Sequence, residues 1–585
     1  MNGFPMQQSL DREDKELVES IYKRLEVWKQ GCMEIHDRAR VARKILLLQD
    51  PYQDPPGTDP KKKTIQLQTL KSTYNNSLAD QIDNAMEAKM LPEVDVAQDI
   101  VDDLNDIVGY IYEYNNYPAL HKKRAGDFLC TGTSITQVLW DDNAQYGSGE
   151  ITFVRVPVEQ FLWDPAEEDI QEARALYKIS WHPMSWYESH YPEQVAYISP
   201  DEKSADAVGE EINQDELMGD ERKAMLIEYW WREYDAAKRR YKVNVAYCAG
   251  RALLEKHMNV YAHGMYPFVV DVHTDIEGLP VGEGMVQELV PMMRYINRYA
   301  KYMDANIRAS AKTRLLVRRD SGLDPEELAD WNNDIIPGDR IDQNSVNFMQ
   351  SPPLSNLSLN LMLQMQSDMK QDSGQNQFQR GESAGGITAA SAINSMQEVG
   401  AKQTRMRTGI LKDGFKRITE QVLWLIAQFY DEKRVVRITG RDGVLRKIDA
   451  SSKRLMATKG GNTVPPPPYI VRVEVQRMNP DAVSEQNQLF IDAYKMSVEA
   501  QKPMPLSTLF RILNVDGKDR LIPIIDSSEN YAETLQMMQQ QNEQLSQQVQ
   551  QQQQSIEGLK NSLVSKQTQA APQINIESEP FATAQ

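Results

Sequence analysis

Apolar residues recur at a helical spacing through the first quarter of the chain. Leu17 and Ile21 lie four residues apart in a charged background, which predicts a helix over residues 10–48. Helical patterns continue over residues 64–120 and beyond, up to a break at Gly132. This part of the chain is therefore expected to be mainly helical.

The pattern then changes to β-forming residues. A run at residues 133–140 ends at the turn Asp141-Asp142-Asn143, and a second run follows at residues 151–157, which predicts a hairpin. Strand character returns over residues 224–270. The stretch before it, residues 200–222, is polar and acidic, and we expect it to be a mobile surface loop.

A long helical pattern occupies residues 285–317, after an apolar strand at residues 267–270 and a glycine-rich turn at residues 278–284. Pro291 predicts an early kink in this helix. Its apolar positions form one stripe that we expect to pack against a neighbour: Ile296, Tyr299, Met303 and Ile307.

Basic residues are concentrated in this segment and just after it, and from Arg294 onward only Asp304 opposes them. The basic residues are Arg294, Arg298, Lys301, Arg308, Lys312, Arg314, Arg318 and Arg319. Several of them share one face at three-to-four-residue spacing. Two interpretations stay open, because these cations can be solvated or paired with carboxylates of a neighbouring subunit, or some of them can face DNA phosphates.

A compact insert follows the basic helix. Asp324 as N-cap and Pro325 in the first turn predict a short helix, and strands or loops then lead to a second long helix over residues 354–370. A glycine-rich loop at residues 374–386 separates it from a third long helix over residues 387–429.

The third long helix is apolar in its later part, which predicts burial of that half. Strands are expected near residues 435–438 and 469–475, and helix again over residues 483–513. Three glycines interrupt the long helix and predict kinks in it: Gly400, Gly409 and Gly414.

The end of the chain is glutamine-rich and of low complexity. A heptad-like alternation predicts a helix that self-associates, as a bundle or barrel, although Gly558 weakens it. A solvated polar helix is the alternative, and residues 567–585 are expected to be disordered. The heptad positions are Leu535, Met538, Asn542, Leu545, Val549, Gln552, Ile556, Leu559 and Leu563.

The composition narrows the class of protein. The chain has 585 residues and a formal net charge of −19, which argues against simple wrapping of nucleic acid by a basic surface. A protein that surrounds DNA without gripping it stays compatible with that charge. Cys32, Cys130 and Cys248 are odd in number and far apart, which favours a reducing compartment. No signal-like or membrane-spanning apolar run is found, so we expect a soluble protein made in a cytoplasm.

Sequence motifs point to no enzyme. Residues 381–385 match GxSxG, but polar residues precede them and every histidine lies at or before His273, so a hydrolase triad in the usual chain order is missing. The chain carries no GxxxxGK[ST] loop and no HExxH motif, and its histidines lack ligand spacing. We therefore expect no catalytic residues, no metal site and no cofactor.

The order of these parts resembles the portal proteins of tailed bacteriophages, most closely the large portals of short-tailed phages. Three short motifs carry the resemblance together with their order and spacing: Val156-Pro157 through Trp163-Asp164-Pro165, Gly282-Glu283-Gly284 before the basic helix, and Gly385-Gly386-Ile387-Thr388-Ala389 before the third long helix. The resemblance implies an α+β, mainly helical portal fold with wing, stem, clip and crown, and a C-terminal helical barrel.

The resemblance also implies a division of the chain by position. The parts are the wing (residues 1–281), stem helix 1 (282–313), the clip (314–353), stem helix 2 (354–373), the tunnel loop (374–386), the spine helix and wing return (387–480), the crown (481–530), a Gln-rich helical barrel (531–566) and a disordered tail (567–585).

The same resemblance implies the site residues. Those of the DNA channel lie on the tunnel loop: Gln375, Asn376, Gln377, Gln379, Arg380 and Ser383. Basic residues of the stem would face the channel or the subunit interface: Arg294, Arg298, Lys301, Arg308 and Lys312. Clip residues would contact terminase or an adaptor: Arg318, Arg319, Glu326, Glu327 and Trp331.

The function that the resemblance implies is a ring, usually of twelve subunits, at one capsid vertex. Viral double-stranded DNA would pass through it during packaging and ejection. Its partners would be further copies of itself, the large terminase subunit, head-tail adaptor or neck proteins, and the major capsid and scaffolding proteins, with no membrane. The alternative is another structural virion protein, such as a tail or internal ejection protein.

Overall fold

The computed structural model divides the chain into two units, residues 1–438 with 447–478 and residues 439–446 with 479–585, and each is described by itself. The residues that the structure describes are 11–50, 52, 66–93, 96–198, 223–237, 239–250, 252–311, 314–329, 335–341, 345–349, 356–374, 390–430, 435–439, 445–456, 469–477, 480–499, 509 and scattered positions between 544 and 558.

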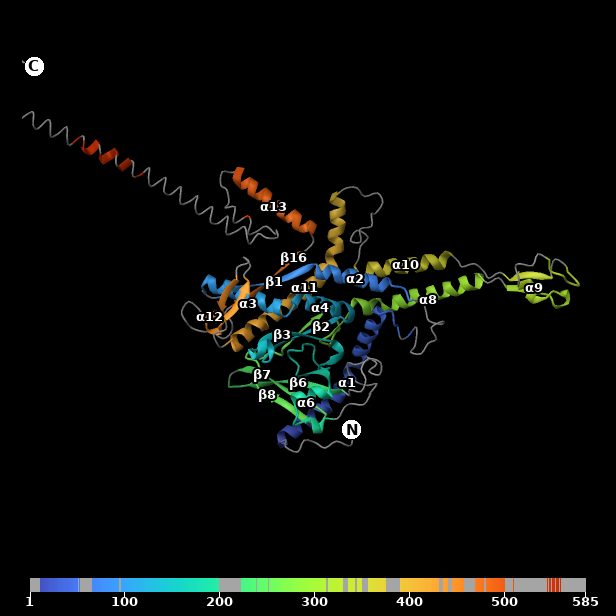
Figure 1. Cartoon of the computed structure of the whole chain (residues 1–585), viewed down its shortest axis with the longest axis horizontal. Coiled ribbons are helices and arrows are strands. Elements are labelled where there is room, and N and C mark those ends of the chain that lie inside the picture. The colour runs from blue at the N-terminus through green and yellow to red at the C-terminus, as the bar shows by residue number, and fades with distance from the viewer. Residues whose placement is uncertain are drawn as a thin grey trace, which may run out of the picture. The chain divides into compact units, whose positions relative to one another are not determined.

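Helix predominates among the described residues (Figure 1). The helices are α1 (Arg12–Leu46), α2 (Thr69–Ile82), α3 (Gln98–Tyr114), α4 (Tyr117–Thr131), α5 (Ala144–Gly147), α6 (Met184–His190), α8 (Met285–Ala311), α9 (Pro325–Ala329), α10 (Asn356–Asp372), α11 (Ala390–Phe429), α12 (Ser452–Leu455) and α13 (Pro480–Glu499), with short 3-10 turns η2 (Val158–Gln160), η3 (Val195–Tyr197) and η4 (Arg319–Ser321).

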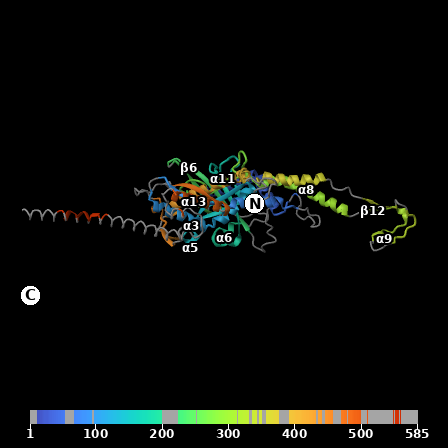
Figure 2. The same ribbon diagram turned by 90° about the horizontal axis from the view of Figure 1, so that it is seen from above.

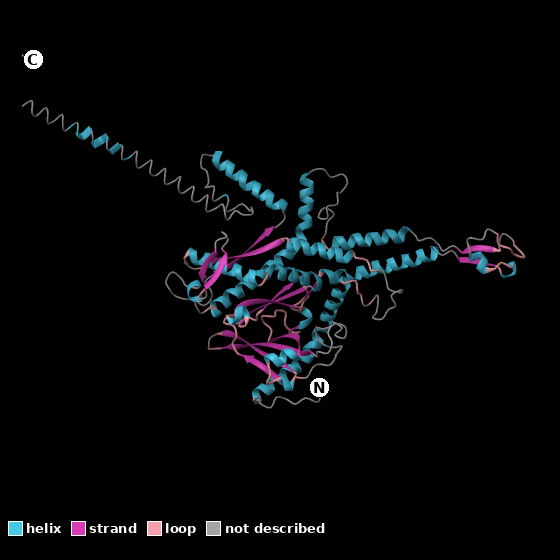
Figure 3. Ribbon diagram, in the orientation of Figure 1, coloured by secondary structure: helices cyan, strands magenta, loops and turns pink. Residues whose placement is uncertain are grey.

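The strands, magenta in Figure 3, form small antiparallel sheets. A three-stranded sheet has the order β3-β2-β9 and a five-stranded sheet the order β4-β5-β6-β7-β8; the pairs β1-β16, β10-β11, β12-β13 and β14-β15 are separate. The strands are β1 (Asn84–Pro92), β2 (Thr133–Asp141), β3 (Glu150–Val156), β4 (Phe161–Leu162), β5 (Ala175–Pro183), β6 (Lys223–Asp235), β7 (Arg240–Ala249), β8 (Ala252–His257), β9 (Phe268–Val272), β10 (Thr274–Asp275), β11 (Gly282–Glu283), β12 (Arg314–Val317), β13 (Val346–Met349), β14 (Val435–Thr439), β15 (Leu445–Asp449) and β16 (Tyr469–Arg477).

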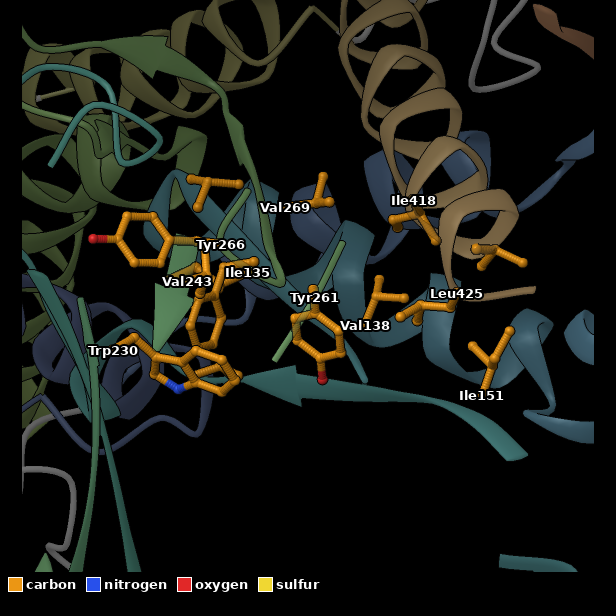
Figure 4. Packing of buried hydrophobic residues seen from close by; sticks show 14 of the residues in the cluster. Ile135, Val138, Ile151, Trp230, Val243, Tyr261, Tyr266, Val269, Ile418 and Leu425 are labelled. Atoms are coloured by element: carbon orange, nitrogen blue, oxygen red, sulfur yellow. The ribbon is translucent and has the colours of Figure 1, made fainter. Parts of the chain in front are cut away.

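One large core joins both of the larger sheets to the later half of α11 (Figure 4). Trp230 comes from the five-stranded sheet, Val138 from the three-stranded sheet, and Ile418, Val422 and Leu425 from α11, and all are buried. The three α11 residues lie four and three residues apart, so that they share one face of the helix. The buried half of this helix was expected from its apolar sequence.

Local patterns in the sequence predicted the N-terminal helices and the first hairpin well. The helix expected over residues 10–48 is α1, and the two β-forming runs pair as β2 and β3. Gly132 ends α4 in the left-handed region at φ 73°, as expected for a helix-terminating glycine. A Cβ at this position would overlap the backbone of Gly284, which opens α8, so the end of α4 packs directly on the start of α8.

Two expectations are wrong. The helical pattern drawn over residues 285–317 ends as helix at Ala311, because residues 314–317 form β12 and pair with β13. Residues 84–92, placed within a helical region, form β1 and pair antiparallel with β16. In both segments a partner strand distant in sequence overrides the local preference for helix.

The remaining long helices follow the expected ranges closely. The second and third long helices are α10 and α11, and α11 is one helix that contains all three glycines. Pro291 likewise lies inside α8. Helix α13 covers the first part of the helix expected over residues 483–513. The expected loop at residues 200–222, and most of the heptad positions after residue 530, lie outside the described residues.

None of the helices in the described part of the chain is both long and apolar enough to span a lipid bilayer.

Candidate functional site

Helices α8 and α10 lie side by side and are connected through the insert that contains β12, α9 and β13 (Figures 1 and 2). Their contact is apolar at the end nearest the core of the unit. The buried apolar cluster at this end comes from α8, α10, α1, α2 and α4: Met285, Val286, Leu289, Val290, Met293, Ile296, Met369, Ala42, Ile45, Leu70 and Cys130.

Both helices also carry apolar side chains that this chain leaves exposed. On α8, Tyr295 is 51% exposed and Tyr302 is 63% exposed, and these two residues lie seven positions apart on one face. On α10, Leu359 and Leu363 are exposed and lie four positions apart. Large apolar residues arranged in this way are typical of a surface that another protein covers. Of the predicted stripe, Ile296 is buried, and Ile307 is 61% exposed.

The first of the predicted basic residues is paired within the chain. Arg294 Nε lies 3.0 Å from Asp50 Oδ2, and its guanidinium carbon lies 4.3 Å from the ring centroid of Tyr52. The carboxylate of Asp50 is 3% exposed, so that the ion pair is shielded on its acidic side. One turn later, Asn297 Oδ1 accepts a hydrogen bond from the backbone N–H of Leu67 at 3.0 Å. This part of α8 therefore holds the chain on both sides of residues 53–65.

The other basic residues of α8 are exposed. Arg298 lies over the ring of Tyr295 at 5.3 Å and, among the described residues, has no carboxylate within ion-pair distance. Lys301 is exposed, and Arg308 pairs with Asp304 at 2.7 Å one turn away. Lys312 lies outside the described residues. Among the predicted basic residues of α8, Arg294 thus has a carboxylate partner within the chain, whereas Arg298 is exposed.

Replacing Arg294 with alanine is expected to destabilise the protein by about 2–4 kcal/mol, because it leaves the buried Asp50 carboxylate without its cation. Replacing Arg298 with alanine is the matched control and should cost less than about 0.5 kcal/mol, because its side chain is exposed. Thermal midpoints of the two variants at the same protein concentration compare them. Equal midpoints would show that the Asp50 pair contributes nothing to stability.

The glycine-rich loop is described only at its beginning. Gly374 follows α10 with φ 85°, in the left-handed region. The six predicted channel residues, Gln375, Asn376, Gln377, Gln379, Arg380 and Ser383, lie outside the described residues, and so does the GxSxG match. Their contact with DNA stays a prediction.

The insert folds locally around β12 and β13. Arg318 Nε pairs with Asp320 at 2.6 Å, and Asp324 Oδ1 accepts a hydrogen bond from the N–H of Glu326 at 3.0 Å, as an N-cap should. Arg319 and Glu326 are exposed, whereas Glu327 is half-buried. Trp331 lies outside the described residues. The insert therefore presents charged side chains of both signs.

A buried polar network that the sequence reasoning did not single out joins α4, β9 and α11. Arg124 on α4 donates from Nε to Asp271 Oδ2 at 2.8 Å, from Nη1 to the Tyr117 hydroxyl at 2.7 Å and from Nη2 to the carbonyl of Leu411 at 3.0 Å. Arg124 and Asp271 are almost fully buried. Burial alone would lower the pKa of Arg124, but Asp271 and Tyr117 outweigh burial and raise it, so the arginine stays charged.

The one sequence signal for this network was Gly414. A Cβ at Gly414 would overlap Asp271 Oδ1 and Arg124 Nη2, so only glycine lets α11 pass this close to the ion pair. The exposed Arg417 reinforces the network, since its Nη2 donates to the carbonyl of Val270 at 2.8 Å. The glycine had been interpreted as a source of kinking in α11 rather than as a packing requirement.

The described residues offer no obvious place for a metal ion. Among them, no three histidine, cysteine or acidic side chains gather in a way that could hold one. All three cysteines are buried and unpaired with one another, and burial raises the pKa of Cys130 and of Cys248 to about 12, which makes them inert thiols.

Comparison with known proteins identifies the family. The model of the phage P22-like portal protein family matches residues 59–573, which is most of the chain. The chain belongs to the P22-like portal protein family. A stretch of 265 residues is also 23% identical to the portal protein of Helicobacter pylori bacteriophage KHP30, covering 45% of this chain and 40% of that protein. The match thus spans less than half the length of this relative.

Portal proteins of phages are structural components of the virion that serve DNA packaging, and the family is not one of enzymes. The family match favours a portal protein over the alternative of a tail or internal ejection protein. It includes both helices of the α8–α10 pair and the glycine-rich loop between α10 and α11.

Proposed function

We propose that this portal protein assembles into a closed ring of about twelve copies at one vertex of the capsid. Double-stranded viral DNA passes through the ring during packaging and ejection. The ring docks the large terminase subunit first and the head-tail adaptor or neck proteins later, and it meets the capsid and scaffolding proteins at its rim. In this proposal α8 and α10 form the stem, and residues 374–386 form the tunnel loop.

The observation that carries the proposal is the exposed apolar face of α8 and α10. Tyr302 is 63% exposed and Leu363 is 52% exposed, although both helices bury other side chains against the core of the unit. A neighbouring copy that presents the other side of its own helix pair covers these side chains. Repeating such a head-to-tail contact by rotation closes a ring.

The charge of the chain supports a channel that does not hold DNA tightly. Each phosphate that a protein neutralises adds favourable free energy and increases the dependence of binding on salt. A subunit with net charge −19 and few exposed cations on α8, such as Arg298, gives a bore that binds DNA weakly. The sequence contains no GxxxxGK[ST] motif, and in this proposal the energy for translocation comes from the terminase ATPase.

The finer parts of the proposal use the division of the chain into clip, crown and barrel that the resemblance to portal proteins implies. Residues 314–353, with Arg318, Arg319, Glu326 and Glu327, form the clip that meets terminase and the adaptor. Residues 481–530 form the crown, and residues 531–566 form a helical barrel. In the second unit, α13 supports a helical crown, because Leu489 and Met496 lie seven residues apart and both are exposed.

Mass photometry and negative-stain images of the purified protein test the proposal. We expect rings of about twelve copies with a central hole wide enough for duplex DNA. Leu363→Glu should shift the population toward monomers, because it places a charge in the covered face, whereas Asn360→Glu, at an exposed polar position of α10, should leave rings intact. A wild-type protein that stays monomeric at high concentration, or rings that tolerate Leu363→Glu, would contradict the proposed interface.

A further inference from the structure

Arg407 on α11 occupies a position that none of the roles above uses. Its side chain is buried, and the residue is 5% exposed. Nε donates to His273 Nε2 at 3.1 Å, and Nη1 donates to the carbonyl oxygen of Ser373 at 3.1 Å. Ser373 is the first residue after α10, and His273 connects β9 to β10. One guanidinium therefore connects α11 to the end of α10 and to the sheet.

The hydrogen bonds determine the tautomer of His273. A guanidinium can only donate, so that His273 Nε2 is the acceptor and Nδ1 carries the proton. Nδ1 then donates to Thr274 Oγ1 at 3.0 Å, and the Thr274 hydroxyl donates to Glu288 Oε1 at 3.0 Å. Burial, and then Arg407, lower the pKa of His273 to about 4 against a hydrogen bond with the backbone of Glu283 that raises it, and the ring stays neutral as this arrangement requires. The chain of donors runs from the cation on α11 to a carboxylate in the first turn of α8.

The end of α10 depends on the same arginine. The N–H of Ser373 donates to Met369 O at 3.2 Å, and the N–H of Gly374 donates to Gln371 O at 2.9 Å, so the last turn closes tightly. The carbonyl of Ser373 points to Arg407 instead of to water, since Ser373 is 1% exposed. A Cβ at Gly374 would overlap the side chain of Gln403, also on α11, so α11 limits the path of the chain from a second side.

We propose that Arg407 is a positioning residue, which fixes the direction in which the chain leaves α10 toward residues 375–386 and connects that point to the start of α8 through His273, Thr274 and Glu288. The local part of this inference stands on the contacts of Arg407 alone. Its consequence for DNA rests on the proposed function of residues 374–386 as the tunnel loop.

Amide hydrogen exchange of the full-length protein tests the local part. In Arg407→Ala, the amides of Ser373 and Gly374, read in a peptide spanning α10 and this end, should exchange about tenfold faster, which corresponds to the loss of one charge-assisted hydrogen bond. Arg405→Ala, an exposed arginine of the same helix, is the control and should leave them unchanged. Unchanged exchange in Arg407→Ala, or an equal increase throughout α3 and α4, would overturn the inference.

Two substitutions of His273 separate the hydrogen bond from packing. Both His273→Gln and His273→Asn lose the edge contact with the ring of Phe128, whose centroid lies 5.0 Å away. Gln places an acceptor near the position of Nε2, whereas Asn does not reach it. We therefore expect exchange at Ser373 and Gly374 to stay near the wild-type rate in His273→Gln and to rise in His273→Asn. Equal exchange rates at Ser373 and Gly374 in both variants would contradict a role for the hydrogen bond between Arg407 and His273.

DNA packaging by rings of Arg407→Ala distinguishes failure of the inference from failure of the proposed function. Faster local exchange together with reduced packaging or retention of DNA supports both. Faster local exchange with wild-type packaging keeps Arg407 as the anchor of α10 but removes the tunnel-loop role of residues 374–386. Unchanged local exchange overturns the inference whatever the packaging result.

Discussion

Replacing Gly414 with alanine is expected to destabilise the protein by about 3–5 kcal/mol, which is the cost of disrupting a buried ion pair. The new Cβ would overlap Asp271 Oδ1 and Arg124 Nη2. Neither group can move into solvent, because both are almost fully buried. Arg124 is also held by Tyr117 and by the carbonyl of Leu411, so its movement would break further hydrogen bonds.

Gly409 provides the matched control on the same helix. A Cβ at Gly409 would meet no atom within 4 Å, so alanine there should stabilise α11 by about 0.5–1 kcal/mol through its higher helix propensity. The thermal midpoints of Gly414→Ala and Gly409→Ala should therefore move in opposite directions from the wild type. Hydrogen exchange should show the loss in Gly414→Ala at α4, β9 and α11. A wild-type midpoint in Gly414→Ala would mean that α11 shifts without breaking the network.

The helices and the first hairpin could be predicted from the sequence because their signals are local. Helix α1 shows its buried face as a spacing of three to four residues, and β2 and β3 are neighbours along the chain. The pairing of β1 with β16 has no local signal. Asn84 pairs with Arg477, and β1 contains alanine, methionine, glutamate and lysine, which favour helix in isolation. Long-range pairing decided its conformation.

The candidate site could also be predicted only in part, because its important contacts join segments that are distant in sequence. The periodicity of α8 placed Arg294 and Arg298 on one helix, but it could not distinguish a cation with an internal partner from an exposed one. The partner of Arg294 is Asp50, 244 residues earlier in the chain. The sequence pattern did not single out Arg407, because its acceptors, His273 and Ser373, come from other elements. The spacing of residues along a helix therefore does not reveal which distant segments supply the partners of its side chains.

Acidification is expected to remove a large part of the stability of the protein between about pH 6.5 and pH 4. Burial is the main cause that lowers the pKa of His121, His263 and His273 to about 4. Over this range the unfolded chain binds more protons than the folded one, so stability is fully present above pH 6.5 and falls toward pH 4. Each histidine contributes on the order of 3 kcal/mol, and the three together approach the whole stability of a typical domain.

His263 is the best residue for testing this effect, because burial is the only cause of its lowered pKa. Its Nδ1 accepts a hydrogen bond from the N–H of Met265 at 2.9 Å, and the Oδ1 of asparagine can take over that role. His263→Asn should therefore reduce the pH dependence of stability by about 1.4 kcal/mol per pH unit between pH 6 and 4.5.

The control for this experiment is His257→Asn, since His257 is an exposed histidine beside Glu255 and the same substitution there removes no buried imidazole. Thermal midpoints measured from pH 7.5 to 4.5 for both variants and the wild type give the comparison. The carboxylates that also titrate in this range are the same in all three proteins, so the difference between the two variants isolates His263. Equal pH dependence in the two variants would show that His263 takes up a proton in the folded state without cost. The acid instability would then have to come from His121 or His273.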